Sequence, residues 1–276
     1  MGRALVTLVV AATTGCADPA RAPELAARWV APSNGMEFIL VQPREFGMGL
    51  LKPPDDLRAA PPHRVGITRP YYLSRYEVTQ AEWEAVVGDL PSRFVDCGPN
   101  CPVESVSWSE VARFLELLGE QNPGEVFRLP TEAEWENACR AGGDGRYGDD
   151  LDTLRVGDAN FDPSIPFEGR AGPEGLDSPV PVGSYPPNSW GFHDLTGNVW
   201  EWVADEYCPY PSEPVLDPVQ SCGTDTIPIR GGSWHFSANA ARCGRRYTHH
   251  RADSGFSIGF RVVREVDPEK QPDESL

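Results

Sequence analysis

Apolar side chains recur at helical spacing in three stretches of the first half of the chain. The first and third begin with a capping box, in which a Thr is followed three residues later by Glu. The second begins at Ser107 or Ser109. We therefore expect helices over about residues 80–88, after Ser107 or Ser109, and after Thr131. Their inward-facing residues are Trp83 and Val86, then Val111, Phe114, Leu115 and Leu118, then Trp135 and Ala138.

Shorter apolar segments alternate with polar residues, as is typical of β-strands. Residues 34–43 predict one strand, and a second begins at residues 46–49 after a turn. Residues 63–78 are expected to be extended. From residue 193 to 263 the pattern predicts short strands and turns.

Little periodicity is present in residues 142–192, which are rich in Gly, Pro and Asp. A loop of this length inside a compact domain usually has a function, such as binding a metal ion. No change of composition divides the chain, so we expect one domain over residues 34–265. The charged residues 266–276 are expected to be disordered.

Composition narrows the class of protein. Gly (27) and Pro (28) make up a fifth of the 276 residues, which favours many turns. Eight Trp argue against disorder, because such side chains are rarely left in water. The net charge of −17 makes nucleic acid and anionic lipid surfaces poor partners, and is compatible with metal cations or basic ligands.

The N-terminus has the pattern of an export signal. Arg3 precedes a short apolar run, and Cys16 ends a segment that resembles the bacterial lipobox. We expect residues 1–16 to be a lipoprotein signal, Cys16 to be lipidated, and residues 17–33 to be a tether. The chain would then be anchored in the bacterial cell envelope, facing the periplasm or the cell surface. Ordinary secretion and a chance match are the alternatives.

Four motifs in fixed order resemble the formylglycine-generating enzyme (sulfatase-modifying factor) family. They are residues 128–136 (RLPTEAEWE), 197–202 (GNVWEW), 230–234 (RGGSW) and 258–261 (IGFR). The resemblance covers about residues 34–264. It implies an irregular α+β fold that is related to C-type lectins and has little regular secondary structure. The first two expected strands resemble the opening hairpin of this family.

Six cysteines follow the lipobox, and an even number in an exported chain suggests a disulfide framework. Two pairs enclose short segments that are rich in turn residues, and a disulfide between the remaining two is implied by the family resemblance. A metal site at the first pair is the alternative, although it lacks an obvious second pair of soft ligands. The expected disulfides are Cys97–Cys101, Cys208–Cys222 and Cys139–Cys243.

Two structural calcium sites are implied by the resemblance. Calcium binds six to eight oxygens, and a Gly turn lets backbone carbonyls point inward together. The first site would use the side chains of Asp194 and Glu201 and the carbonyls of Gly197 and Val199. The matching ligands of the second site are the side chains of Asn160 and Glu174 and the carbonyls of Phe161 and Leu176.

Catalytic members of the family bind copper(I) through two cysteines, and this chain has Phe236 and, without a gap, Ala241 at those positions. Copper(I) prefers soft ligands, so copper is not expected here. Cys243 is the nearest thiol, but it would then leave Cys139 unpaired. Histidines do not offer a replacement, since His249 and His250 are adjacent and would face opposite sides of a strand.

A ligand groove is the remaining expectation. The family lines its substrate groove with the C-terminal segment, and Arg and aromatic residues together suit peptides or anionic small molecules. We therefore interpret the chain as a binding or scaffold module without the copper site. The alternatives are an oxygen-dependent oxidoreductase with an altered active site and a purely structural envelope protein. The expected groove residues are Trp234, His235, Phe236, Asn239, Arg242, Arg245, Arg246 and Tyr247.

Overall fold

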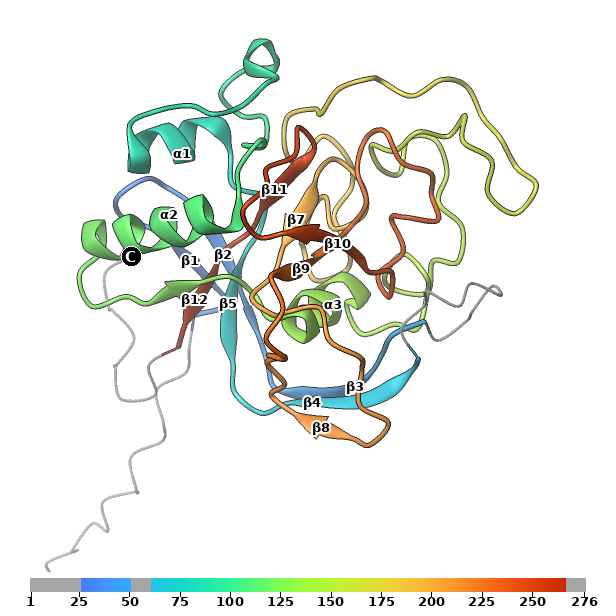
Figure 1. Cartoon of the computed structure of the whole chain (residues 1–276), viewed down its shortest axis with the longest axis horizontal. Helices are drawn as coiled ribbons and strands as arrows, with labels where there is room; N and C mark the ends of the chain where they lie inside the picture. The colour runs from blue at the N-terminus through green and yellow to red at the C-terminus, as the bar shows by residue number, and fades with distance from the viewer. Residues whose placement is uncertain (1–25, 51–60, 267–276) are drawn as a thin grey trace, which may run out of the picture.

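The computed structural model describes residues 26–50 and 61–266. These residues form three short helices and three small β-sheets joined by long loops (Figure 1). The helices are α1 (Gln80–Val87), α2 (Trp108–Gln121) and α3 (Glu132–Arg140), and a single 3-10 turn covers Val95–Cys97. This confirms the irregular α+β fold with little regular secondary structure that the family resemblance implied.

Twelve short strands of the described residues make up the sheets. The five-stranded sheet has the order β1-β2-β5-β12-β6, with strands Arg28–Val30, Glu37–Val41, Tyr71–Ser74, Val263–Glu265 and Phe127–Arg128. The four-stranded sheet has the order β10-β9-β7-β11, with strands Tyr247–His250, Thr226–Arg230, Trp200–Trp202 and Ile258–Phe260. The three-stranded sheet has the order β3-β4-β8, with strands Arg44–Met48, His63–Ile67 and Val215–Leu216.

All three helices begin with a complete capping box. In each box the N-cap hydroxyl accepts a hydrogen bond from the backbone N–H three residues later, and the Glu at that position accepts one from the N-cap backbone. Such caps each contribute about 1 kcal/mol to stability. Of the two serines proposed for the second helix, Ser107 is the cap. The three boxes are Thr79–Glu82, Ser107–Glu110 and Thr131–Glu134.

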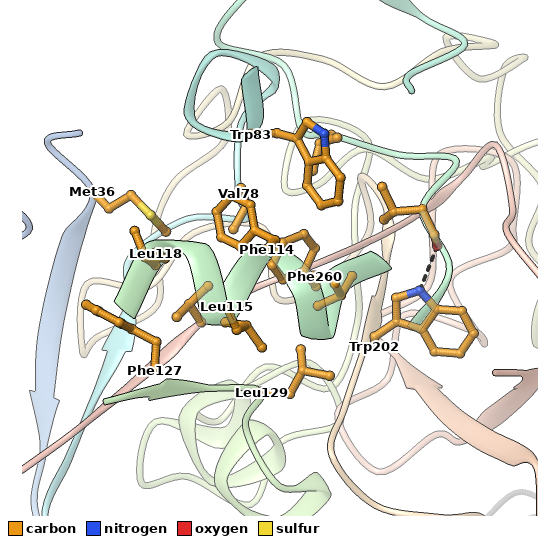
Figure 2. Packing of buried hydrophobic residues seen from close by; sticks show 14 of the residues in the cluster. Met36, Val78, Trp83, Phe114, Leu115, Leu118, Phe127, Leu129, Trp202 and Phe260 are labelled. Carbon is orange, nitrogen blue, oxygen red and sulfur yellow. Dashed lines mark hydrogen bonds between the residues drawn. The ribbon is translucent and has the colours of Figure 1, made fainter. Parts of the chain in front are cut away.

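Helices α1 and α2 pack together over the hydrophobic core (Figure 2). Trp83 stacks on Phe114 with ring centroids 5.3 Å apart, and Phe260 meets both rings edge-on. Trp202 is completely buried, and its indole N–H donates to the carbonyl of Val106 at 2.9 Å. The core therefore joins the helices to strands β7 and β11, which lead into the candidate site.

Two expectations for the N-terminal part are corrected. Residues 28–30, expected to lie in the tether, form β1, because Trp29 packs on Phe38 and Phe127. The expected hairpin between the first two strands is also absent. Strand β2 pairs with β1 and β5, whereas β3 pairs with β4 in another sheet.

The expected signal segment, Cys16, residues 17–25 of the tether and residues 267–276 of the tail lie outside the described residues. Within the described part of the chain, no helix has the length and apolar character that crossing a bilayer requires.

Candidate functional site

Helix α3 carries a buried network of ion pairs that holds strand β9 in place. Arg230 is completely buried between two acids of α3, at 2.7 Å from Glu132 and 2.6 Å from Glu136. Arg246 also contacts Glu132 at 2.6 Å, and Arg140 contacts Glu136 at 2.6 Å. The RLPTEAEWE motif therefore fixes the first residue of the RGGSW motif.

Asp205 completes this α3 network. Its two carboxylate oxygens accept hydrogen bonds from the backbone N–H groups of Glu132 (2.6 Å) and Gln220 (2.8 Å). Burial, reinforced by the charge of Glu132, raises the pKa of Asp205 to about 7. This carboxyl is thus partly protonated near neutral pH.

Six cysteines of the described residues form three disulfides, and the α3 network is tied to one of them. Arg230 donates to the carbonyl of Cys243, whose sulfur is bonded to Cys139 at the end of α3. The pairs are those expected from the sequence, namely Cys97–Cys101, Cys139–Cys243 and Cys208–Cys222.

The glycines of the RGGSW motif allow a close turn. Gly232 has φ of 79°, and a Cβ there would lie 2.9 Å from the backbone of Ala241. The GNVWEW motif lies alongside this turn. Gly197 N–H donates to the carbonyl of Gly231 (2.7 Å), and Trp234 N–H donates to that of Asn198 (2.9 Å). Two motifs that are separated in the sequence are thereby joined by backbone hydrogen bonds.

Five aromatic rings lie close together next to this turn. We call them the aromatic site: Phe94, Trp234, His235, Phe236 and Phe256. The ring of Trp234 lies 5.5 Å from Phe94 and 4.5 Å from His235. His235 in turn lies 4.6 Å from Phe236 and 5.1 Å from Phe256. Because Phe256 is 39% exposed, the site is open to solvent at its edge.

Polar groups border the aromatic site. The indole Nε1 of Trp234 is buried and has no hydrogen-bond acceptor among the described residues. Arg93 is exposed, with its guanidinium 5.8 Å from the ring centre of Phe94 and 5.2 Å from that of Phe256. Burial lowers the pKa of His235, so its imidazole is neutral near pH 7. The site thus offers one cation and one buried donor.

The structure brings together part of the expected groove. Trp234, His235 and Phe236 belong to the aromatic site, and Tyr247 contacts Phe236 at 5.7 Å. Asn239 is half-buried. Three further arginines of the expected groove are at most 7% exposed and pack against neighbouring rings or acids: Arg242, Arg245 and Arg246.

Sequence reasoning missed Arg93, Phe94 and Phe256. The first two lie in a loop far from the recognised motifs. Phe256 precedes the IGFR motif by two residues, and this closeness to the motif was the only sequence feature that could have indicated a place in the site.

The two positions that carry copper-binding cysteines in catalytic relatives carry apolar side chains in this chain. The ring of Phe236 packs on Trp200, and Ala241 packs with Tyr147 and Phe161. Cys243 is completely buried and bonded to Cys139. The described residues therefore offer no pair of thiols, and this donor set does not fit copper(I).

The first expected calcium region contains a paired carboxylate. Glu201 is fully buried and accepts hydrogen bonds from Arg261 Nε (2.6 Å) and Nη2 (2.7 Å) and from Trp135 Nε1 (2.7 Å). Asp194 accepts a hydrogen bond from the N–H of Gly183 at 2.7 Å. Gly197 and Val199 lie between these acids in the same turn. Glu201 is thus paired with a guanidinium.

Glu77, which the sequence did not single out, completes an acidic cluster with Asp194, Glu201 and Arg261. Its oxygens accept from Asn198 Nδ2 (2.6 Å) and from a backbone N–H. Burial, followed by the charges of Asp194 and Glu201, raises the pKa of Glu77, and burial raises that of Asp194 to about 6. Three carboxylates thus face one guanidinium, leaving an excess of two negative charges when all are ionised.

The second expected calcium region contains an oxygen without a partner. Asn160 is 2% exposed, and its Oδ1 accepts no hydrogen bond from the described residues. A Cβ on Gly175 would lie 3.2 Å from Asp162, which places the segment of Glu174 and Leu176 beside that of Asn160 and Phe161. Buried oxygens of this kind are normally satisfied. An oxygen without a partner at this position is compatible with an oxygen-binding cation such as calcium.

Capped helices, small sheets and a long loop around a Gly-Gly-Ser-Trp turn define a formylglycine-generating-enzyme-like domain. Residues 27–266 match the model of the family "Sulfatase-modifying factor enzyme 1-like domain", and the chain belongs to this family.

Named relatives include both catalytic and inactive proteins. The chain is 36% identical over 207 residues to the formylglycine-generating enzyme of Streptomyces coelicolor, covering 69% of this chain and 60% of the relative. It is 30% identical over 176 residues to mouse "Inactive C-alpha-formylglycine-generating enzyme 2", covering 62% and 51%. The chain thus spans less than two thirds of either relative. The solved structure of PvdO from Pseudomonas aeruginosa superposes with a TM-score of 0.70 at 26% identity, covering 90% of this chain and 100% of PvdO.

Proposed function

We propose that this protein is an exported, lipid-anchored binding or scaffold module of the sulfatase-modifying-factor family that does not oxidise cysteine. One observation carries the proposal: each cysteine of the described residues is in a disulfide, while the aromatic site keeps a buried N–H donor without an acceptor.

The proposed ligand of the aromatic site is a peptide or small molecule with a carboxylate next to an apolar group. A buried donor without a partner costs about 1–3 kcal/mol, which an acceptor on the ligand would recover. Trp234 Nε1 would supply that hydrogen bond, and exposed Arg93 would attract the carboxylate. The rings of Phe94 and Phe256 would contact the apolar group.

Isothermal titration calorimetry with N-acetylphenylalanine and with its uncharged amide tests binding at the aromatic site. We expect the carboxylate form to bind more tightly than the amide. Trp234→Phe keeps an aromatic ring but removes the donor, and should weaken binding roughly tenfold. Trp108→Phe is the matched control, because the Trp108 indole already donates to the carbonyl of Val203 at 2.9 Å. Equal weakening in both variants would contradict the proposal.

The absence of oxidation has its own test. Protein supplied with copper(I) and a cysteine-containing peptide should consume no oxygen above the rate of copper alone. Retention of about one copper per chain together with a free Cys243 thiol would instead support the oxidoreductase alternative. If neither ligand nor metal binds, a purely structural envelope protein remains.

Export and anchoring are supported by the three disulfides, which persist in oxidising compartments, and by the lipobox-like Cys16. The chain should partition with bacterial membranes, and its mature N-terminal peptide should carry the mass of a lipidated cysteine. Cys16→Ser should release it into the soluble fraction. Unchanged membrane association of this variant would exclude the lipid anchor.

We also propose that calcium stabilises the fold at one or both expected regions. The excess charge of the acidic cluster and the unpaired Oδ1 of Asn160 support this proposal. Calcium would neutralise buried carboxylates and order the loop around Asn160. No catalytic step is assigned to it.

A further inference from the structure

A cavity of about 300 Å³ lies between the ends of strands β4, β5 and β12 and the start of α3. Asp217 and Val219, which follow β8, also line it, and none of the lining residues belongs to the aromatic site. Ile67, Tyr71, Val219 and Val266 give the cavity apolar walls. Ligand pockets span roughly 300–1,000 Å³, so this cavity suits a molecule no larger than a dipeptide.

One side of the cavity carries a charge cluster with surplus negative charge. Arg128 donates to both carboxylate oxygens of Glu134, at 2.6 and 2.7 Å, and its Nε donates to Glu265 at 2.9 Å. One guanidinium therefore faces two carboxylates. The side chain of Glu265 is 49% exposed, so its charge is available at the mouth of the cavity.

A cation without a partner borders the same cavity. Arg69 is exposed and forms no ion pair with any residue in the described ranges 26–50 and 61–266. The neighbouring carboxylate of Asp217 accepts two hydrogen bonds from Thr68, one from its backbone N–H at 2.7 Å and one from its hydroxyl. Arg69 is thus the group that remains to bind an anion.

We propose that this cavity binds a short zwitterionic peptide with apolar side chains, about the size of a dipeptide. The ligand ammonium pairs with Glu265, and its carboxylate pairs with Arg69. The apolar side chains pack on Ile67, Tyr71 and Val219. Because the mouth of the cavity carries both a negative and a positive charge, it favours a ligand that has an ammonium and a carboxylate. Hydrogen bonds between charged groups are stronger than those between neutral groups.

Calorimetry of the full chain with leucyl-leucine tests this assignment. We expect binding, with about tenfold weaker binding of the N-acetylated and of the C-amidated dipeptide, because each analogue loses one charged contact. Arg69→Met should weaken the dipeptide about tenfold and remove the discrimination against the amide. Val219→Trp should abolish binding by filling the cavity.

Two controls separate this site from other surfaces. Arg64→Met changes an exposed arginine that pairs with Glu45 outside the cavity, and should leave the affinity unchanged. Leucyl-leucine also carries the carboxylate and apolar group proposed for the aromatic site, so the titrations are repeated in the Trp234→Phe variant. Binding that remains there is assigned to the cavity, and failure of the aromatic-site proposal can be distinguished from failure here. The proposal is overturned if leucyl-leucine does not bind at about 10 mM, or if Val219→Trp binds it as well as the original chain does.

Discussion

The α3 network and the acidic cluster are both buried groups of charged side chains, but they differ in the balance between acids and arginines. The α3 network joins three acids to three arginines, namely Glu132, Glu136 and Asp205 with Arg140, Arg230 and Arg246. The acidic cluster joins three acids to a single arginine, namely Glu77, Asp194 and Glu201 with Arg261.

This difference separates a structural cluster from one that needs a further cation. Buried charges are tolerated when they are paired and hydrogen-bonded. Glu132 and Glu136 of the α3 network meet this condition through its arginines, whereas Asp205 is held by backbone N–H groups. In the acidic cluster, burial and mutual repulsion raise the pKa of Glu77 and Asp194, so protons or a divalent cation must offset the charge.

The largest effect is expected from Arg230→Met. This change leaves Glu132 and Glu136 buried with one arginine each, and loss of a buried partner costs about 3–5 kcal/mol of the free energy of unfolding. Urea denaturation measures this loss. If the network is self-sufficient, the loss is the same in calcium and in EDTA. A loss below about 1 kcal/mol, or one that calcium restores, would contradict the comparison.

The pH dependence of Asp205 gives the next effect. The unfolded carboxyl titrates near 3.8 and the folded one at about 7, so between these values the folded state holds a proton that the unfolded state has released. The free energy of unfolding therefore falls as pH rises from about 4 to 7, by at most about 4 kcal/mol, and then levels off.

Asp205→Asn should flatten that dependence. Urea denaturation of the original chain and of Asp205→Asn, in EDTA from pH 4 to pH 8, measures this change. The difference between the two curves of unfolding free energy against pH removes the contributions of the acidic cluster. Parallel curves would mean that Asp205 stays ionised across this range.

Local sequence signals predicted the helices better than the sheets. Each helix begins with a capping box that is complete within four residues, so Thr79 and Thr131 could be identified without tertiary contacts. Strand β1 could not, because Trp29 lies in an Ala- and Pro-rich segment and is fixed by Phe127, almost a hundred residues away.

In the candidate site, too, residues with a local sequence signal were predicted and residues fixed by distant contacts were not. The motifs located Trp234 and Glu201, but they did not say which side of the following loop faces solvent, and Arg242 proved to be buried. Glu77 has no motif of its own. Its role depends on a contact with Asn198, 121 residues later, which only the tertiary structure shows.

Calcium should act at the expected region around Asn160 and not on the α3 network. At a free calcium concentration 100 times its dissociation constant, binding adds about 2.7 kcal/mol to the free energy of unfolding. Thermal unfolding in calcium, magnesium and EDTA measures this gain. Arg230→Met should keep the response, whereas Asn160→Ala should reduce it.

Asn137→Ala is the matched control for Asn160→Ala. Asn137 is also buried and also has an Oδ1 without a hydrogen-bond donor among the described residues, but it lies in α3. A calcium response that is lost equally in both variants would indicate general destabilisation. An undiminished response in Asn160→Ala would place the ion elsewhere.

The smallest effect is expected from the exposed pair of Arg64 and Glu45, which tests whether burial is what gives the two clusters their importance. Their side chains approach to 3.0 Å, compared with 2.7 and 2.6 Å in the buried pairs of Arg230, and they are 66% and 69% exposed. Water screens their attraction, and ordering two long side chains costs entropy, so Arg64→Met should change the free energy of unfolding by less than about 0.5 kcal/mol. Urea denaturation at low and high salt would check this. A loss as large as that of Arg230→Met would mean that ion pairing itself, and not removal from water, determines how much each arginine contributes.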